Sequence, residues 1–228
     1  VGIAIGVVLL PDVSRHLRAG NHEAVMDSQN RSLEFALLLT LPASVALAIV
    51  PTEIVKGLFE RGAFTARDTP FTAYALAIFA FGLPAFVMIK VFSPAYFARE
   101  DTKTPMRYAT ISLAANTLGS IDLFFLFRHL GWMPHLGIAL ATTLGGWLNA
   151  GLLYATLVKR GNFVPDARIK RTVPRIVLAS ILMGCALAAL APMLGGWFGQ
   201  GASILWRGLG LAVLVGGGWR KVLAVLLH

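Results

Sequence analysis

The stretch LGIALATTLGGWLNAGLLYATLV, residues 136–158, decides the fold because it is 23 residues long and contains no charged side chain. A helix needs about 20 mostly apolar residues to cross the hydrocarbon core of a bilayer. A β-strand that crosses needs only about ten residues with strict alternation, and this stretch does not alternate. In lipid its backbone groups can be satisfied only within a helix, so the stretch is predicted to be a transmembrane helix.

Other apolar runs surround this stretch. The first, 1–11, is too short to span and is expected to be the end of a truncated helix, so the chain is expected to be a piece of a longer protein. The other predicted spans are 33–50, with a continuation to residue 58 left open, 71–92, 108–127, 176–198 and 204–227. The predicted fold class is an all-α polytopic membrane protein with about six full transmembrane helices. The polar segment 12–31 is expected to form a short helix at the cytoplasmic face or a solvated loop helix.

The composition agrees with a membrane protein and excludes other classes. The chain is 57% hydrophobic and 14% charged, against about 25% charged residues in soluble domains. Its net charge of +9 does not predict nucleic-acid binding, because the basic residues lie in short loops rather than on one face. Catalytic signatures and metal-ligand spacings are absent from the sequence, which predicts neither an enzyme nor a metal site.

The loops on one side of the predicted membrane, side A, carry more basic residues than those on the other. Side A holds fourteen of the twenty: Arg15, Arg18, Arg31, Arg99, Lys103, Arg107, Lys159, Arg160, Arg168, Lys170, Arg171, Arg175, Arg220 and Lys221. The opposite side holds five: Lys56, Arg61, Arg67, Arg128 and Arg207. Basic loops stay in the cytoplasm, so side A and the C-terminus are predicted to be cytoplasmic.

Two charged residues lie inside predicted spans. Lys90 is a functional candidate because a lysine in a membrane helix is costly, although its stem can also snorkel to the nearby headgroups. Asp122 lies fourteen residues into the span 108–127. It either faces a cavity or a partner, or it lies at the outer interface.

Uncharged polar residues mark the same two spans. Asn116 and Ser120 are four residues apart and share one helix face. Thr142, Thr143 and Asn149 add polar atoms to the span 136–158. These side chains are candidates for a hydrophilic cavity or an ion site, while hydrogen bonds between helices are the ordinary alternative.

Three loop signatures resemble a known family. They are LLPDVSR at 9–15, LFERGAFTARDT at 58–69 and KVFSPAYFAREDTKTP at 90–105. In order and spacing they are similar to the MurJ/MviN family of lipid II flippases, within the multidrug/oligosaccharidyl-lipid/polysaccharide exporter superfamily. The resemblance covers essentially the whole chain and implies its C-terminal half, from the end of the eighth of fourteen helices.

The resemblance implies a function and a division of the chain. Members move undecaprenyl-pyrophosphate-linked peptidoglycan precursor from the inner to the outer leaflet of the bacterial inner membrane by alternating access. Residues 1–158 would belong to the C-terminal lobe, and 159–228 would form the last two helices with a groove for the polyprenyl tail. The implied partners are the lipid-linked precursor, membrane lipids and the N-terminal half. The alternatives are another exporter of the superfamily, for a different polyprenyl-linked glycan or a drug, and a non-transporting scaffold for cell-wall enzymes.

The resemblance also implies site residues. Lys90, Arg99, Asp101 and Lys103 lie in the segment that would join two helices at the cytoplasmic gate, with a solvated turn as the alternative. No cofactor is expected, and a sodium ion or the membrane potential would be the driving force. Asn116, Ser120 and Thr142 or Thr143 fall near the sodium ligands of some members. This sequence has Ser120 where an acid can occur, and Asp122 has the wrong helical phase to replace it.

Overall fold

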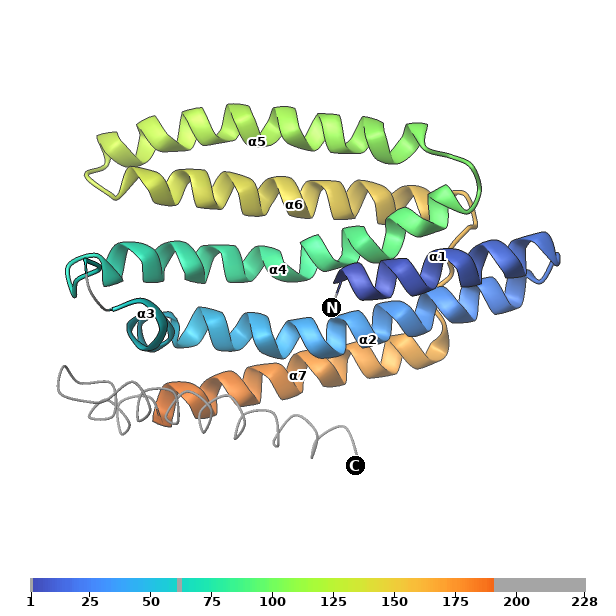
Figure 1. Ribbon diagram of the computed structural model, residues 1–228, viewed down its shortest axis with the longest axis horizontal. Helices are drawn as coiled ribbons and strands as arrows, with labels where there is room; N and C mark the ends of the chain where they lie inside the picture. Colours follow the sequence, from blue (N-terminus) through green and yellow to red (C-terminus); the bar gives the residue numbers. More distant parts are fainter. Residues whose placement is uncertain (1, 61–62, 191–228) are drawn as a thin grey trace. The chain divides into compact units, whose positions relative to one another are not determined.

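The computed structural model describes residues 2–60 and 63–190, and all regular structure in this part is helical (Figure 1). The helices are α1 (Gly2–Arg18), α2 (His22–Ile49), α3 (Pro51–Phe59), α4 (Thr69–Phe97), α5 (Lys103–His129), α6 (Pro134–Lys159) and α7 (Ala167–Leu190). Five of them, α2, α4, α5, α6 and α7, are long and apolar enough to cross a membrane. The predicted all-helical membrane fold is confirmed. The predicted last span, 204–227, lies outside the described residues.

The polar segment 12–31 does not form a helix of its own, so that prediction is wrong. Its first part completes α1, which ends at Arg18, and its second part is the start of α2. Between them the chain turns at Gly20, whose φ of +69° favours glycine. Asn21 then caps α2, because its side-chain oxygen accepts a hydrogen bond from the backbone N–H of Ala24 at 3.0 Å. The polar segment thus continues α1 and begins α2 rather than forming a helix between them.

The continuation of the second span to residue 58 is also wrong, because the helix breaks at Val50. Val50 has φ −119° and ψ 45°, outside the helical region, and α3 begins at the next residue, Pro51. Proline has no backbone N–H to donate to the preceding turn. It fits the first position of a helix, where that donor is not needed, and so starts α3 as a separate helix.

The chain divides into two compact units. Unit 1 comprises residues 1–40 and 82–174, and unit 2 comprises residues 41–81 and 175–228. Helices α2, α4 and α7 each contribute to both units, and each boundary lies within two residues of a proline: Pro42, Pro84 or Pro174. The predicted division at residue 158 separates the family's last two helices, and it stays a prediction.

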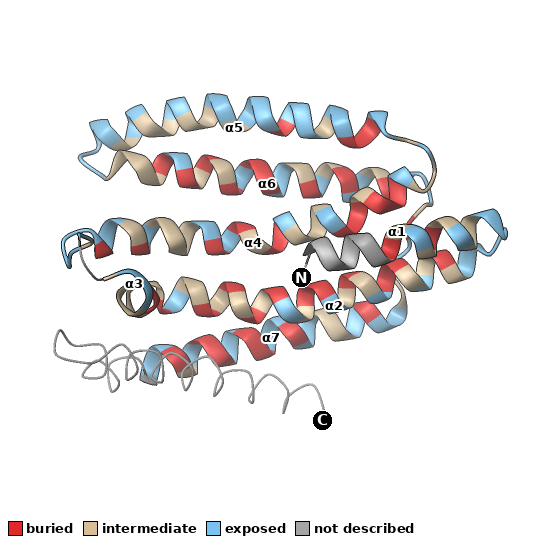
Figure 2. Ribbon diagram, viewed as in Figure 1, coloured by how far each residue is buried: buried red, intermediate tan, exposed pale blue. Residues whose placement is uncertain are grey.

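In unit 1, α5 and α6 lie side by side, but they are buried to very different extents (Figures 1 and 2). The buried positions of α6 are mostly small: Gly137, Ala139, Ala141, Thr143, Gly145, Gly146, Ala150, Leu153 and Leu157. By contrast, α5 buries only Thr104, Pro105 and Ser112. Its exposed face carries large apolar side chains, such as Leu113, Leu118 and Phe125. Such a face is stable in hydrocarbon and would be an aggregation hazard in water.

Unit 2 has an apolar core of its own. Ala46, Val50 and Ile54 pack with Ala179, Met183 and Leu187 of α7. The core contains no charged residue, as expected where helices pack against one another in lipid.

Candidate functional site

A polar cavity of about 280 Å³ lies in unit 1, among α4, α5 and α6. Its polar lining consists of Lys90 from α4, Ser112 and Asn116 from α5, and Thr142 and Asn149 from α6. The rest of the lining is apolar or glycine: Phe86, Ile89, Ala109, Leu113, Gly145 and Gly146. The cavity therefore brings together four of the residues that the sequence singled out, and it has room for several water molecules or a small polar group.

The amide of Asn116 joins α5 to α6. Its oxygen accepts hydrogen bonds from the Ser120 hydroxyl at 3.2 Å and from the Thr142 hydroxyl at 3.3 Å. The four-residue spacing of Asn116 and Ser120 thus places them on one face, as the sequence indicates. Thr143 is buried and packs close to Gly82 of α4. Of the two adjacent threonines, only Thr142 lines the cavity.

Ser112 and Asn149 have buried polar atoms with no hydrogen-bond partner among the described residues. These atoms are the Ser112 hydroxyl oxygen and the Asn149 side-chain carbonyl oxygen, and both residues line the cavity. Ser112 is only 6% exposed. Sequence reasoning missed Ser112, although it lies four residues before Asn116 and so belongs to the same polar stripe of α5. Buried polar atoms without partners are rare, and they mark positions where a ligand or water can bind.

Lys90 brings the only charge into the described lining of this cavity. It lies seven residues before the end of α4 at Phe97, about 10 Å along the helix axis at 1.5 Å per residue. Its side chain lines a space that also reaches Asn116 and Thr142. Lys90 is exposed, so both a role in the cavity and snorkelling to the headgroups stay predictions.

Two glycines of α6 leave room for the side chains of Asn116 and Phe86, which line the cavity. A Cβ atom on Gly145 would lie 3.1 Å from the Cβ of Asn116, and one on Gly146 would lie 2.9 Å from the Phe86 ring. The second distance is shorter than real Cβ contacts allow. The pair Gly145–Gly146 thus lets Asn116 and Phe86 approach the backbone of α6 closely.

Asp122 does not reach the cavity. It is exposed on α5 and is not among the residues of the cavity lining. It lies seven residues before the helix ends at His129, so about 10 Å from that end. The structure therefore places Asp122 on another face from Asn116, as its helical phase indicates.

The loop between α4 and α5 is held by Asp101. Its carboxylate accepts hydrogen bonds from the hydroxyl of Thr104 at 2.7 Å and from the backbone N–H of Thr104 at 3.0 Å. It also pairs with Arg160, just after α6, at 2.6 Å. These hydrogen bonds and the ion pair, with the Thr104 hydroxyl contributing most, lower the pKa of Asp101 to about 2. Asp101 also raises the pKa of Arg160 through its hydrogen bond.

Arg99 ties the same loop to the residues after α6. It donates hydrogen bonds to the carbonyl oxygens of Ala95 at 2.7 Å and Asn162 at 3.4 Å. Partial burial lowers its pKa through desolvation. Lys103 is exposed in the first turn of α5. The contacts of Arg99 and Asp101 all lie within unit 1, so they fix the loop to α6 inside one unit.

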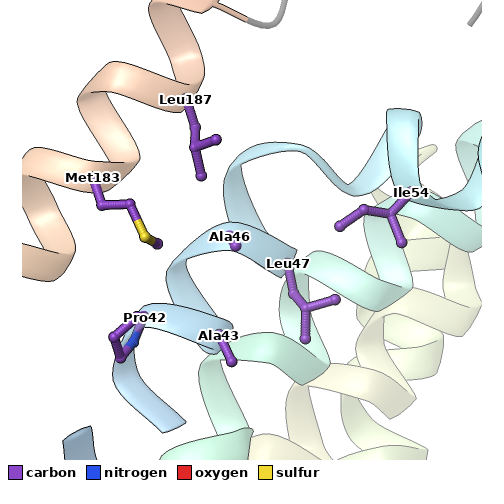
Figure 3. Close-up of a pocket in the computed structure, with 7 residues that line it drawn as sticks. All are labelled: Pro42, Ala43, Ala46, Leu47, Ile54, Met183 and Leu187. Atoms are coloured by element: carbon purple, nitrogen blue, oxygen red, sulfur yellow. The ribbon is translucent and has the colours of Figure 1, made fainter. Parts of the chain in front are cut away.

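Unit 2 holds an apolar pocket of about 230 Å³ (Figure 3). It is lined by Pro42, Ala43, Ala46, Leu47, Ile54, Met183 and Leu187. Figure 3 shows Met183 and Leu187 on one helix and Ala46 on another. All seven described lining residues are apolar, so this pocket suits apolar groups.

The comparisons with known proteins decide the family. The family model described as lipid II flippase MurJ matches residues 1–205. The chain belongs to this family. It is 43% identical over 217 residues to a probable lipid II flippase MurJ of Rhizobium tropici, and that alignment covers 94% of the chain and 40% of the relative. The corresponding protein of Rhizobium meliloti is 44% identical, with 94% and 39% covered. The resemblance inferred from the three loop signatures is confirmed.

A solved structure also supports membership of this family. A structure titled lipid II flippase MurJ, inward closed conformation, matches with a TM-score of 0.70 and 25% identity, covering 98% of the chain and 42% of that structure. The chain therefore spans about 40% of the length of the curated relatives and the solved structure that it matches.

The residues that line the cavity in the described part of the chain do not by themselves form a sodium site. Asn116 supplies an amide oxygen, but that oxygen already accepts a hydrogen bond from Ser120 and shares the Thr142 hydroxyl proton with the Ile138 carbonyl oxygen, which lies closer to Thr142 at 2.9 Å. No carboxylate lines the cavity in the described residues, while the basic residue Lys90 is part of the lining. Hard cations require several oxygen ligands with negative charge nearby, and a positive charge in the same space repels them.

Proposed function

We propose that this chain is the C-terminal part of a lipid II flippase, which moves undecaprenyl-pyrophosphate-linked peptidoglycan precursor from the inner to the outer leaflet. The match of the family model to residues 1–205 carries this proposal. The polar cavity of unit 1, enclosed by helices fit for a membrane, supports it. Proteins of this family are transporters, so no catalytic role is proposed.

The physical task is to move a charged, sugar-bearing headgroup through hydrocarbon. Polar groups in a membrane cavity replace the water that the headgroup loses, so the cost of crossing falls. The polyprenyl tail stays in the lipid beside helices such as α5, whose outward side chains are apolar. Alternating exposure of the cavity to the two sides would then complete transport.

The proposed location is the bacterial inner membrane, with the C-terminus in the cytoplasm. The excess of basic residues in the loops of side A supports this orientation. The proposed partners are the lipid-linked precursor, membrane lipids and the remaining part of a family-length protein. A reporter that fluoresces only in the cytoplasm, fused after His228 of the parent protein, tests the orientation; a dark but stably expressed fusion would contradict it.

Complementation tests the function. We would express the parent protein in bacteria depleted of their own lipid II flippase and expect growth and cell shape to be restored. The control is an inactive relative, expressed in the same bacteria at the same level in the membrane. Failure of a well-expressed parent would favour an exporter of another polyprenyl-linked glycan or a scaffold. Translocation assays in liposomes separate these two, because an exporter would move its own polyprenyl-linked glycan, whereas a scaffold would move no lipid.

The driving force is proposed to be the membrane potential, with a sodium gradient as the alternative. The poor fit of the cavity residues to sodium favours the potential. Liposomes that contain the parent protein should translocate precursor when a potassium diffusion potential is imposed in sodium-free buffer. Transport that requires sodium at constant potential would contradict this proposal.

A further inference from the structure

An acidic pocket lies in unit 1 at the side A end of α2, and it shares no lining residue with the polar cavity. Its volume is about 360 Å³, and it is lined by His22, Glu23, Met26, Asp27, Asn30, Val164 and Asp166. Among the described residues, the lining contains three carboxylates and neither Lys nor Arg. The pocket is thus a negative patch on the side of the chain that carries fourteen of the twenty basic residues.

Asn30 adds a hydrogen-bond acceptor to the lining. Its side-chain nitrogen donates hydrogen bonds to the carbonyl oxygens of Met26 at 2.9 Å and Val164 at 3.0 Å. These two bonds fix the orientation of the amide, because a flip would place its oxygen against two carbonyl oxygens. Asn30 is only 3% exposed, and its side-chain oxygen has no hydrogen-bond partner among the described residues. A buried acceptor without a partner requires a donor, so the pocket calls for a ligand with N–H groups.

The local roles of the acidic residues leave the pocket with a net negative charge. Asp166 caps α7, because its carboxylate accepts a hydrogen bond from the backbone N–H of Ile169 at 2.6 Å. Asp27 lies 3.3 Å from Arg31 in an exposed ion pair, and such pairs contribute little. The N-termini of α2 and α7 together add about one positive charge, against three carboxylates. The pocket therefore attracts cations.

The arrangement suits an organic cation rather than a metal ion. In the described part of the chain, no group of three His, Cys, Asp or Glu side chains could hold a metal ion. The carboxylates instead line a wider space, which fits an ammonium group on a flexible stem. The ammonium of a lysine has three N–H donors, one for the Asn30 oxygen and two for carboxylates. Met26 and Val164 supply apolar contacts for the stem.

The pocket extends beyond the layer of lipid headgroups. Asn30 lies three residues and Glu23 ten residues before Leu33, where the predicted span begins. These separations are about 4.5 and 15 Å along the helix axis. The headgroup layer on each side of the hydrocarbon core is about 5–8 Å thick. Glu23 therefore lies beyond the headgroups, and the occupant enters the pocket from the water.

We infer that this pocket binds a lysine side chain from a basic peptide segment on side A. The inference uses the proposed orientation, in which side A is cytoplasmic, and it does not depend on the transported substrate. Membrane proteins concentrate Lys and Arg in their cytoplasmic loops, so basic segments lie at the level of the pocket. A segment tethered to the same membrane face reaches an effective concentration in the millimolar range, which gives it an advantage over a free cation.

Peptide binding to the purified parent protein tests this inference. The protein in phosphatidylcholine nanodiscs is titrated with acetyl-Lys-Lys-Lys-amide in a calorimeter, and nanodiscs without the protein supply the baseline. The double variant Glu23→Gln, Asp27→Asn should raise the Kd about tenfold, since each exposed charge contributes up to about fivefold. The same peptide with trimethylated lysines keeps its charge but has no N–H donor on the ammonium groups. It should bind about fivefold more weakly or worse.

The matched control is Glu100→Gln, which removes an exposed carboxylate on side A that is not among the lining residues. It should bind the peptide within about twofold of the wild type. Both acids replaced in the double variant are exposed, and thermal unfolding verifies that the variant is folded. Nanodiscs expose both faces of the protein, so this result does not depend on the orientation in the cell, which the fluorescent reporter tests separately.

Five results would overturn the inference. The first three are a wild type that does not bind the peptide, an unchanged Kd in the double variant, and equal binding of the trimethylated peptide. The fourth is loss of peptide binding in nanodiscs that contain phosphatidylethanolamine, which would assign the pocket to the amine of a lipid headgroup. The fifth is spermidine that binds tenfold more tightly than the peptide, which would assign the pocket to a free polyamine.

Discussion

Gly137 of α6 should be the least replaceable glycine in the contact between α5 and α6. A Cβ atom built at this position would lie 2.6 Å from the backbone carbon and oxygen of Leu123 and 2.9 Å from the backbone nitrogen of Phe124. These neighbours are backbone atoms of α5, so no side-chain rotation can relieve the clash. The change Gly137→Ala must therefore push the two helices apart.

The size of the effect follows from the geometry. Carbon atoms in contact prefer about 3.5–4.0 Å, so α5 must withdraw by about 1 Å at this point. A gap of that size forfeits roughly a quarter to a half of the dispersion energy of the contacts that it opens. Overpacking of this kind typically costs about 1–3 kcal/mol. Alanine also favours the helix over glycine by up to about 1 kcal/mol, which partly offsets the loss.

Gly151→Ala is the matched control, because a Cβ at Gly151 has no neighbour within 4 Å. Both variants make the same change in the same helix, so their difference isolates the clash. We expect the parent protein with Gly137→Ala to be about 1–3 kcal/mol less stable than with Gly151→Ala in reversible denaturation. Hydrogen exchange of α5 amides near Leu123 should be faster. Equal stability of the two variants, with unchanged exchange, would refute the close helix contact.

Three further predictions concern stability. The pKa of Asp101 is about 2 against an ordinary 3.8, so the stabilisation that Asp101 provides is complete above about pH 4 and is lost as the pH falls toward 2. Asp101→Asn should lower the Tm at pH 7 and flatten the decline of the Tm below pH 4. A variant whose Tm falls with acid as steeply as that of the wild type would contradict this. Tyr96 is buried and donates a hydrogen bond to the Leu153 carbonyl at 2.7 Å. Tyr96→Phe should therefore lower the free energy of unfolding by about 0.5–1.5 kcal/mol, while the control Tyr74→Phe, at an exposed position, should not change it measurably. Equal effects of the two substitutions would refute the hydrogen bond of Tyr96. The Gln29 side chain is 2% exposed, and its amide atoms have no hydrogen-bond partner among the described residues. Gln29→Leu should therefore stabilise the protein by about 1 kcal/mol or more. A lower Tm would show that the amide has a partner in the folded protein.

The membrane fold was accessible from the sequence because hydrocarbon imposes one requirement on every residue of a span. The uncharged run 136–158 predicts α6 to within two residues at either end, Pro134–Lys159. The same reasoning failed where charged residues continue a helix into water, as at 12–31. Hydrophobicity marks where lipid begins, whereas the end of a helix depends on local geometry, such as the turn at Gly20.

The cavity was only partly accessible, because helix phase was known while the pairing of helices was not. The phase of α5 placed Asn116 and Ser120 together and kept Asp122 apart. It did not show that α6 would present Thr142 rather than Thr143 to Asn116. Only the packed structure reveals which polar atoms lack partners, because a partner can come from any neighbouring helix.

The signature at 90–105, which identified the family, combines two physical roles. Asp101 caps α5 and pairs with Arg160, and Arg99 binds the carbonyl of Asn162. These contacts join the loop to the end of α6, so that part of the signature maintains the shape of unit 1. Lys90 differs, because it lines the cavity and has no acidic neighbour in the described lining. The loop contacts are satisfied within unit 1, whereas Lys90 is exposed and lines the cavity. We therefore expect transport by the parent protein to fall more when Lys90 is replaced than when Asp101 is replaced, even though both residues belong to one continuous motif.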